Sequence, residues 1–469
     1  MLALSQRELI ALTLVFAASL PAVTPRIYAS DEIQYFSYLR SLWFDRDVSF
    51  ENEYRHFFDR DVGRGENFHG TFLELRTDTG KRPNFGTVGA AILWAPFYAR
   101  ADAGVRVARA AGSAVEANGY SKPYVAAVAY GSAVYGFLAI VLAASAARQT
   151  IGRAGLALRD DSVLAAALVW IGTPILFYMY VAPPYAHACS AFAVALFVWV
   201  WLQVRQGWSL RGAVALGMTG ALMGMVREQD LFFALGPAVD FVLTGLTDRR
   251  RTGNAGVLQD RVMIAAAGCA AFVVGYLPQI IAYWALNGYP GPSKLVARKM
   301  IWYSPHALQV LGSPEHGFLL WTPLALLAIA GLLVLAVKGK EEGRRLGGCA
   351  LLMFALQVYV SGAVDSWSVA GAFGQRRFVA VTVLLAIGLA VTLGQVRQTT
   401  ARAACAVALA ACVWWNLGLT AAFGIGLMNR QRLELARNAY DVFVTIPRLA
   451  PALAVRYLTN RDSLYQTKG

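Results

Sequence analysis

Charged residues are scarce in this chain of 469 residues. Asp, Glu, Lys and Arg together make up 15% of it, whereas soluble globular proteins carry about 25%. Hydrophobic residues make up 57%. A soluble chain of this length needs more charge to cover its surface, so the composition argues against a cytosolic enzyme. The same hydrophobic content argues against an intrinsically disordered chain.

Cysteine is scarce as well, which argues against a disulfide-rich secreted domain. The five cysteines all lie within apolar stretches of the chain: Cys189, Cys269, Cys349, Cys405 and Cys412. This setting predicts small core residues rather than disulfide partners or metal ligands.

Several motifs of nucleotide and metal chemistry are absent from the sequence. It has no phosphate-binding loop ending in Gly-Lys-Ser/Thr, no H-E-x-x-H and no nucleophile elbow, and Gly424 and Gly426 lack the third glycine of a dinucleotide fingerprint. None of the five histidines has metal-ligand spacing with another His or Cys. We therefore predict no metal site and no required cofactor, although a divalent metal stays open. An enzyme of this kind would take a substrate that is already activated.

Long apolar runs are what the sequence has in abundance. A run of about 18 or more residues can cross a bilayer as a helix. The first run follows Glu8 and extends to about Tyr28, which is too long for a signal-peptide core and predicts a retained anchor. The further runs lie near 121–147, 161–182, 186–204, 212–226, 229–246, 262–286, 317–337, 346–364, 377–395 and 403–423. We predict an all-α polytopic membrane protein with about eleven transmembrane helices.

The pair 212–226 and 229–246 leaves two interpretations open. Both runs are short, and the polar tetrapeptide from Arg227 to Asp230 separates them. The pair could form two full spans or a helical hairpin that does not cross the bilayer completely.

The distribution of basic residues predicts the orientation in the membrane. Most Lys and Arg of the short loops fall on the same side as the N-terminus, and few fall on the other side. By the positive-inside rule, the N-terminus is cytoplasmic, and an odd number of spans places the C-terminus outside. The net charge of +14 therefore sets topology and predicts no nucleic-acid partner. The expected location is a bacterial inner membrane, crossed many times.

We predict a single integral membrane domain, 1–469, with three external segments at 29–120, 287–316 and 424–469. The first external segment carries two helical patterns, one from Ser30 as N-cap to about Asp47 and one from about Thr87 to Ala111. Both patterns are typical of helices that lie at the membrane surface.

The sharpest chemical feature is the acidic pair Asp31-Glu32, which follows the first span on the external side. A helix N-terminus favours their negative charge, and a carboxylate there could serve as a general base or bind a cation. The competing interpretation is ordinary acidic filling of a first helical turn. Position alone gives the two interpretations equal weight.

Basic residues on the external side are the candidates for an anion site. Arg376 and Arg377 could hold a phosphate bidentately at the depth of a lipid head group, and interfacial snorkelling is the alternative. Arg227 interrupts a nearly continuous apolar region, where an internal salt bridge to a neighbouring acid competes with function. For Lys294 and Arg298, a simple surface role is equally consistent with the sequence.

Two histidines near external turns complete the candidate set. His187 follows Pro183-Pro184-Tyr185, and His316 begins the run at 317–337. Either imidazole could hydrogen-bond a phosphate or a hydroxyl of a substrate. Considered singly, each is more often a satisfied helix-end histidine.

Together these features resemble the GT-C membrane glycosyltransferases, and among them the protein O-mannosyltransferases and the bacterial lipid A aminoarabinose transferases. The resemblance lies in the retained first span, in Asp31-Glu32 with Tyr35, and in the long external loop with surface helices. Four stretches also look like those of bacterial members of this group: Ser30–Tyr54, Asn84–Tyr98, Ser313–Pro323 and Gly371–Phe378.

The chain also departs from these families. The Lys-Pro-Pro-Leu type start of their second surface helix is replaced by the segment from Arg82 to Gly86. We also expect no soluble domain after the last span. These departures bear on the substrate more than on the fold.

The resemblance implies a polyprenyl-phosphate-linked sugar as donor and a lipid, glycan or protein hydroxyl as acceptor, on the periplasmic side. It implies inversion at the anomeric carbon, with Asp31 as base and Glu32 as its support or alternate. The residues implied in binding the donor phosphate are Arg227, Lys294, Arg298, His187, His316, Arg376 and Arg377. A leaving monophosphate needs less neutralisation than a diphosphate, so a metal is not compulsory.

Two other classes of function compete with a transferase. A lipid-linked glycan transporter or flippase predicts inverted repeats and broken helices at the midplane. The two halves of the sequence show no matching pair of segments, and the informative charges gather on one side. A non-catalytic membrane subunit would tolerate loss of the carboxylates.

Overall fold

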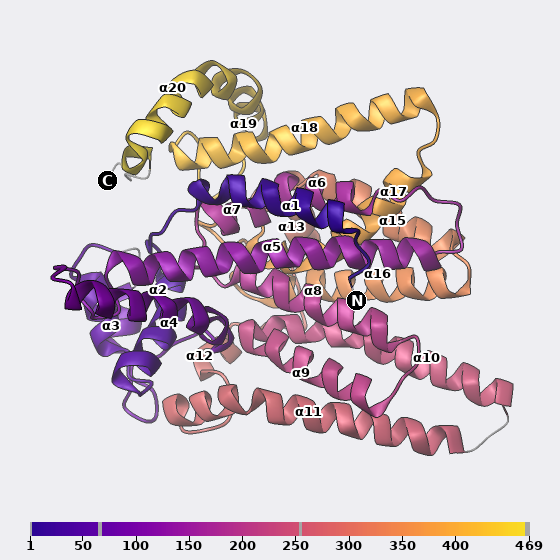
Figure 1. Ribbon diagram of the computed structural model, residues 1–469, viewed down its shortest axis with the longest axis horizontal. Coiled ribbons are helices and arrows are strands. Elements are labelled where there is room, and N and C mark those ends of the chain that lie inside the picture. Colours follow the sequence, from indigo (N-terminus) through magenta and orange to yellow (C-terminus); the bar gives the residue numbers. More distant parts are fainter. Residues whose placement is uncertain (1, 64–67, 253–255, 465–469) are drawn as a thin grey trace. The chain divides into compact units, whose positions relative to one another are not determined.

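The computed structural model describes residues 2–63, 68–252 and 256–464, and within these ranges it is helical with no strand (Figure 1). The all-α prediction is confirmed. The chain divides into two compact units, each assembled from two separate stretches. The described residues of 1–146 and 178–300 form the first unit, and those of 147–177 and 301–469 form the second.

The helices of the first unit are α1 (Gln6–Ser19), α2 (Ser30–Arg40), α3 (Glu51–Phe58), α4 (Gly89–Ala110), most of α5 (Lys122–Arg153), α8 (His187–Val204), α9 (Leu210–Val226), α10 (Leu235–Thr252), α11 (Gly256–Asn287) and α12 (Lys294–Arg298). Short 3-10 or π turns join several of them: η1 (Leu20–Ala22), η2 (Ser41–Asp45), η3 (His69–Glu74) and η4 (Glu228–Ala234).

The helices of the second unit are α6 (Ser162–Gly172), α13 (Ala307–Gly312), α14 (Phe318–Trp321), α15 (Leu324–Lys338), α16 (Glu341–Ala363), α17 (Thr382–Gln395), α18 (Thr399–Gly424), α19 (Leu435–Tyr440) and α20 (Ile446–Thr459). Helix α7 (Ile175–Tyr180) lies at the boundary of the two units. The turns of the second unit are η5 (Arg376–Val381), η6 (Asp441–Thr445) and η7 (Arg461–Leu464).

Eight helical stretches in the described ranges are long and apolar enough to cross a membrane, which confirms a multi-pass membrane protein. They are α5, α8, η4 with α10, α11 from Leu258, α16, η5 with α17, α18, and the stretch Leu435–Thr459. Three shorter apolar helices, α6, α9 and α15, coincide with other predicted runs.

The count of about eleven spans is not confirmed. The first predicted run forms α1 and the turn η1, which end at Ala22. Together they are too short to count among the helices that can cross a membrane. Pro21 is the second residue of η1, just after the α-helix ends, because proline cannot continue the helical hydrogen bonds. In contrast, the stretch Leu435–Thr459, which we predict only as part of an external tail, has the length and composition of a span.

Small residues let the helices of each unit pack closely. In the first unit, a Cβ atom built on Gly217 of α9 would lie 2.2 Å from the carbonyl oxygen of Gly268 on α11. In the second unit, a Cβ atom on Gly331 of α15 would lie 1.8 Å from the carbonyl oxygen of Gly388 on α17. Backbones in contact at glycine are typical of helix packing in membranes, where dispersion forces replace the hydrophobic effect.

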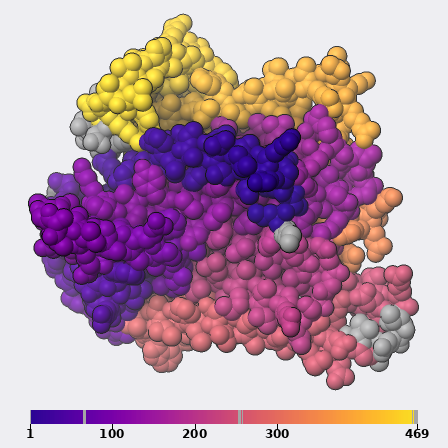
Figure 2. Space-filling view, in the orientation of Figure 1, coloured from indigo at the N-terminus to yellow at the C-terminus, as the bar shows by residue number. Residues whose placement is uncertain are grey.

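Segment 29–120, the predicted first external segment, gathers at one end of the first unit, in the indigo and purple colours of Figures 1 and 2. The predicted helix 30–47 forms α2 and the π-helical turn η2, and the predicted helix 87–111 forms α4. Ala29 is the N-cap of α2, so the predicted N-cap Ser30 is wrong by one residue.

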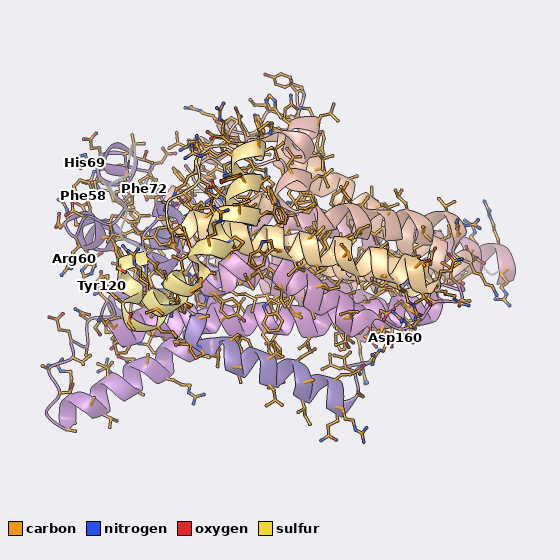
Figure 3. All side chains as sticks on the ribbon, turned by 90° about the horizontal axis from the view of Figure 1, so that it is seen from above. Phe58, Arg60, His69, Phe72, Tyr120 and Asp160 are labelled. Atoms are coloured by element: carbon orange, nitrogen blue, oxygen red, sulfur yellow. The ribbon has the colours of Figure 1, made fainter. Side chains whose placement is uncertain are left out.

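An aromatic cluster holds the short helices of this segment together. Figure 3 labels Phe58, Phe72 and Tyr120, which lie with Arg60 and His69 at the same end of the first unit. Arg40 at the end of α2 donates to the fully buried Glu53 of α3, with 3.0 Å between Nη1 and Oε1. The first external segment therefore has a packed interior of its own beside the membrane helices.

The five cysteines are free thiols, but they do not share one environment. Cys189 and Cys349 are buried, as predicted for core residues. The prediction is wrong for Cys269, which is exposed on α11, and for the half-buried Cys405 and Cys412. An apolar stretch of a membrane protein faces lipid as readily as the core, so hydropathy cannot separate the two.

Candidate active site

The acidic pair lies in the first turn of α2, and its two carboxyl groups have different surroundings. Asp31 is half-buried, whereas Glu32 is 0% exposed. Oε2 of Glu32 accepts hydrogen bonds from the backbone N–H groups of Tyr28 at 2.7 Å and Ala29 at 3.1 Å. Glu32 therefore caps the helix by folding back over its N-terminus, the role of the third helical residue in a capping box.

Burial raises the pKa of the Glu32 carboxyl from 4.5 to about 8, although the two backbone hydrogen bonds act in the opposite direction. At neutral pH this group is mostly protonated, so only a small fraction is available to act as a base. Asp31, which is half-buried, stays the candidate for the base.

Replacement of Glu32 by Gln is expected to flatten the pH dependence of stability. The folded state binds the Glu32 proton more tightly than the unfolded chain, so its stabilising contribution is complete below pH 4.5 and is lost as pH rises through about 8. Gln keeps an oxygen for the two N–H groups and carries no charge. Thermal unfolding in detergent between pH 5 and 9 measures this, with the exposed Glu341→Gln as control. Identical pH profiles for wild type and Glu32→Gln would contradict this account.

One face of α2 carries Asp31, Gln34, Tyr35 and Tyr38, which recur at helical spacing. The segment from Asn84 onward runs along this helix. The backbone N–H of Phe85 donates to Oε1 of Gln34 at 2.8 Å, and Asn84 Nδ2 donates to the Gln34 carbonyl at 3.0 Å.

The same segment then joins α2 to the ends of α9 and α11. The Thr87 hydroxyl donates to the carbonyl of Val226 at 2.8 Å, and the Val88 N–H donates to Oε1 of Gln279 at 2.9 Å. Gly89 lies against the backbone of Met225 so closely that an added Cβ atom would lie 2.3 Å from its carbonyl carbon. The acidic helix and the residues that follow α9 are thus connected through one buried segment.

Arg227 is an extended residue between α9 and η4, with φ −155° and ψ 118°. Its Nη1 atom contacts Nδ1 of His187 at the start of α8, so two residues from the predicted set meet. His187 is buried and packs against Tyr178 and Tyr185, with ring centroids 4.5 and 5.6 Å apart. The charge of Arg227 also acts on the buried Asp230, so an internal pairing with this acid stays the alternative to a role in binding.

Lys294 and Arg298 lie on α12, at the edge of the first external segment, and both are exposed. Nζ of Lys294 forms an ion pair with Oδ2 of Asp78 at 2.7 Å. A pocket of about 180 Å³ lies beside this pair. Its lining comprises Leu75, Arg76, Thr77, Asp78, Pro83, Asn287, Tyr289, Ser293, Lys294 and Leu295. Lys294 thus connects α12 to the loop before Pro83.

The second unit holds the other three residues of the predicted set. His316 is fully buried with a positive φ of 78°, stacks on Trp321 and makes a 2.9 Å hydrogen bond between Nε2 and the Ala372 carbonyl oxygen. Burial lowers the pKa of His316, so its imidazole is neutral near pH 7.

Arg376 and Arg377 differ in their surroundings. Arg377 is buried, and its guanidinium donates to the carbonyl of Ser366 at 3.0 Å. Arg376 is half-buried, and its charge acts on His316. Gln375 joins the segment of His316 to the segment of Trp367, because its Nε2 atom donates to the backbone carbonyls of both residues. Arg376 is therefore the better candidate for a ligand, and Arg377 for a structural role.

The structure also shows polar residues that sequence reasoning missed. Tyr276, Gln279 and Tyr283 share one face of α11, and Glu228 follows Arg227 directly. The signal was present in the sequence, since polar side chains at helical spacing within an apolar span mark a functional face.

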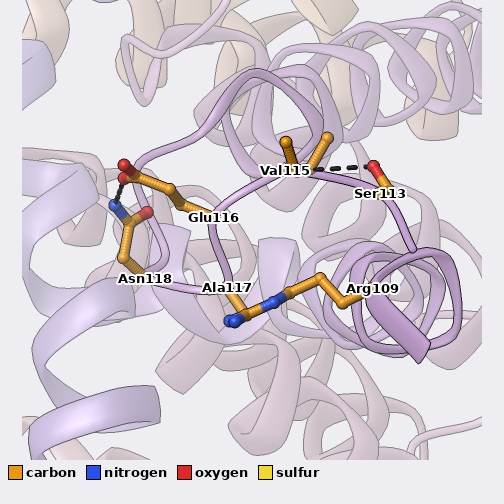
Figure 4. Close-up of a pocket in the computed structure, with 7 residues that line it drawn as sticks. Arg109, Ser113, Val115, Glu116, Ala117 and Asn118 are labelled. Atoms are coloured by element: carbon orange, nitrogen blue, oxygen red, sulfur yellow. Dashed lines mark hydrogen bonds between the residues drawn. The ribbon is translucent and has the colours of Figure 1, made fainter. Parts of the chain in front are cut away.

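A second pocket, of about 260 Å³, lies in the loop between α4 and α5 (Figure 4). It is lined by Arg109 and the residues from Ser113 to Asn118. None of these belongs to the predicted site, and the pocket is formed by neighbours in sequence.

Comparison with known proteins identifies the fold. No protein-family model and no curated protein sequence matches the chain. Among solved structures, the chain is similar to ArnT from Cupriavidus metallidurans bound to undecaprenyl phosphate, with a TM-score of 0.53 and 15% sequence identity. The match covers 98% of this chain and 72% of ArnT.

The chain has the GT-C fold. The chain shares this fold with ArnT, so the fold implied by the resemblance in sequence is confirmed. The match spans both units of the chain, because it leaves almost no part of it uncovered.

Proposed function

We propose that the protein is a membrane glycosyltransferase that moves a sugar from a polyprenyl-phosphate donor to an acceptor hydroxyl. The observation that carries the proposal is the GT-C fold, shared with a structure that holds undecaprenyl phosphate. The half-buried Asp31 and Arg227, both in the first unit, support the proposal because this reaction needs a base and a cation.

In the proposed reaction, Asp31 takes the proton of the acceptor hydroxyl while that oxygen attacks the anomeric carbon of the donor. The new carbon–oxygen bond forms as the bond from the anomeric carbon to the phosphate oxygen breaks. The lipid phosphate leaves with the electron pair, and the anomeric centre inverts. General-base catalysis of this kind contributes about 10²–10⁴-fold to the rate.

The leaving phosphate gains negative charge, which cations placed beside it stabilise. In the first unit, Arg227 is the strongest candidate, because His187 orients its guanidinium. Arg376, which lies near His316 in the second unit, is the alternative candidate. The proposed set also keeps three supporting charges: Lys294, Arg298 and Arg377. Lys294 forms an ion pair with Asp78, and Arg377 donates to the carbonyl of Ser366.

The proposed orientation places the N-terminus in the cytoplasm, the C-terminus outside and the reaction on the periplasmic side of an inner membrane. The distribution of Lys and Arg over the short loops supports it. A donor that is activated in the cytoplasm and presented outside also fits the absence of a nucleotide-binding motif from the sequence.

Replacement of Arg376 by Ala is expected to weaken binding of undecaprenyl phosphate by about tenfold, the effect of one lost hydrogen bond to a charged group. Fluorescence titration of the protein in detergent measures the affinity. Arg402→Ala, at an exposed residue on the proposed cytoplasmic side, is the control and should bind as the wild type does. An unchanged affinity in a correctly folded Arg376→Ala variant would move the phosphate site elsewhere.

A further inference from the structure

The two faces of α11 have opposite character. Leu277, Ile281 and Trp284 are exposed and apolar, as expected for a face toward lipid. The other face carries Tyr276, Gln279 and Tyr283, which follow one another at intervals of three and four residues. Gln279 and Tyr283 are buried within the first unit. Polar side chains inside a membrane bundle are costly, so a row of them indicates a function.

The polar face of α11 contacts the carboxylate of Glu228. The hydroxyl of Tyr276 donates to Oε1 of Glu228 at 3.3 Å, and Tyr283 of the same face interacts electrostatically with this carboxylate. Tyr38 of α2 is close enough for the charge of Glu228 to contribute, after burial, to a raised pKa of its hydroxyl. Three tyrosines from two helices therefore interact with one acid.

Three buried polar atoms on α2, α11 and η4 of the first unit lack partners. The Tyr38 hydroxyl, Nε2 of Gln279 and Oδ1 of Asp230 have no hydrogen-bond partner within the described residues, and all three side chains are 0% exposed. Native proteins satisfy most such groups, and each orphan costs about 1–3 kcal/mol. A polar ligand beside Glu228 would supply the missing bonds.

The kinds of atom present select the chemistry of that ligand. Gln279 offers a donor, Asp230 offers an acceptor, and the Tyr38 hydroxyl can do both. A hydroxyl group donates and accepts, so it can satisfy all three. A phosphate only accepts, and the carboxylates of Glu228 and Asp230 would repel it. The set therefore fits the hydroxyl groups of a sugar and disfavours a phosphate.

The position of Glu228 next to Arg227, the proposed binder of the phosphate, also supports a sugar at this place. Glu228 directly follows Arg227, whose guanidinium meets His187. Tyr38 lies two turns from Asp31 on the same face of α2, about 10 Å along the helix axis. A donor whose phosphate binds Arg227 would thus have its sugar beside Glu228, on the face of α2 that also carries Asp31.

We propose that Glu228, Tyr38, Tyr276, Tyr283 and Gln279 form a subsite that binds the hydroxyl groups of the donor sugar. This inference rests on the proposed function and adds to it the part of the site that selects the sugar. Substrates that lack the matching hydroxyl leave buried polar groups unpaired, which is a strong source of discrimination.

The test compares the binding of a bare lipid phosphate with the binding of the same lipid phosphate carrying different sugars. Undecaprenyl phosphate and a panel of undecaprenyl-phosphate-linked pentoses and hexoses are titrated against wild type, Glu228→Gln and Tyr38→Phe in detergent. For the sugar that wild type prefers, each variant is expected to bind about tenfold more weakly. Each should bind the bare lipid phosphate within about twofold of wild type. Tyr135→Phe, which loses a hydroxyl that donates to the Leu93 carbonyl, is the matched control.

The outcomes separate the subsite from the function on which it rests. If wild type binds no lipid of the panel, the proposed function fails. If wild type binds every sugar-linked lipid as it binds the bare phosphate, or if the variants weaken both lipids equally, the subsite is wrong and the function stands. If Glu228→Gln fails to fold, Tyr38→Phe and Tyr283→Phe decide, because each removes only one hydroxyl.

Discussion

Sugar transfer by the Asp31→Asn variant is expected to be slower than that of the wild type by about 10²–10⁴-fold, the contribution of a positioned general base. Asn has nearly the same shape as Asp but cannot take a proton from the acceptor at neutral pH. The variant should fold, because Glu32 and not Asp31 caps α2. Binding of undecaprenyl phosphate should stay unchanged, since the proposed phosphate ligands are basic residues elsewhere.

Single-turnover transfer of a labelled sugar at saturating donor measures this effect without interference from product release. Glu32→Gln is the matched control, because it removes the neighbouring carboxyl group in the same helical turn. It should retain most of the activity at pH 7, where Glu32 is already mostly protonated. Equal losses in both variants would show that the acidic turn serves the fold, and full activity in Asp31→Asn would remove Asp31 from the mechanism.

The Arg227→Ala variant is expected to lose about 10²–10³-fold in kcat/KM, the cost of removing one group that stabilises a developing oxyanion. Arg227 is half-buried, its backbone is fixed between α9 and η4, and His187 contacts its guanidinium. A cation held in this way needs little reorganisation when the phosphate leaves.

Arg227→Lys separates charge from geometry. Lys keeps the positive charge but lacks the planar fork of Arg, so it should recover part of the activity and not all of it. Arg211→Ala, at an exposed residue at the other end of α9, controls for the loss of one charge. Wild-type kcat/KM in a stably folded Arg227→Ala variant would contradict the proposed role. Thermal unfolding of each variant confirms that the comparison is between folded proteins.

Most membrane helices could be predicted from the sequence, because the thickness of the bilayer sets the length of an apolar run. The prediction was weakest where a helix breaks inside a run. The run 161–182 forms α6 and α7, which are separated at Thr173 and Pro174. The end of α6 is held by Asn416 of α18, whose side-chain amide donates to the carbonyls of Ile171 and Thr173. Such a tertiary contact leaves no periodic signal in the sequence.

The candidate site shows the same division between local and tertiary information. The acidic pair and its place at the start of a helix follow from the sequence. The roles within the pair depend on one residue of register: with Ala29 as N-cap, Glu32 becomes the third helical residue and reaches back to the backbone. The sequence does not distinguish Arg376 from Arg377 either, because their burial and the bond from Arg377 to the Ser366 carbonyl follow from tertiary packing.

The polar face of α11 could have been found by its spacing, but its meaning could not. Tyr276 and Tyr283 become a possible sugar site only beside Glu228, about fifty residues earlier in the chain. Buried polar atoms without partners become visible only when the packing around them is known.

The central claim is that this chain catalyses transfer of a sugar from a lipid phosphate. The most direct measurement uses the purified protein in detergent, polyprenyl-phosphate sugars labelled in the sugar, and membranes from cells lacking the protein as the source of acceptor. We predict that wild type and Glu32→Gln move label from the donor to an acceptor and release free polyprenyl phosphate, whereas Asp31→Asn does so about 10²–10⁴-fold more slowly. A flippase moves intact lipids and does no chemistry in detergent. Label that stays on the lipid with wild type, or moves equally fast with Asp31→Asn, would contradict the account.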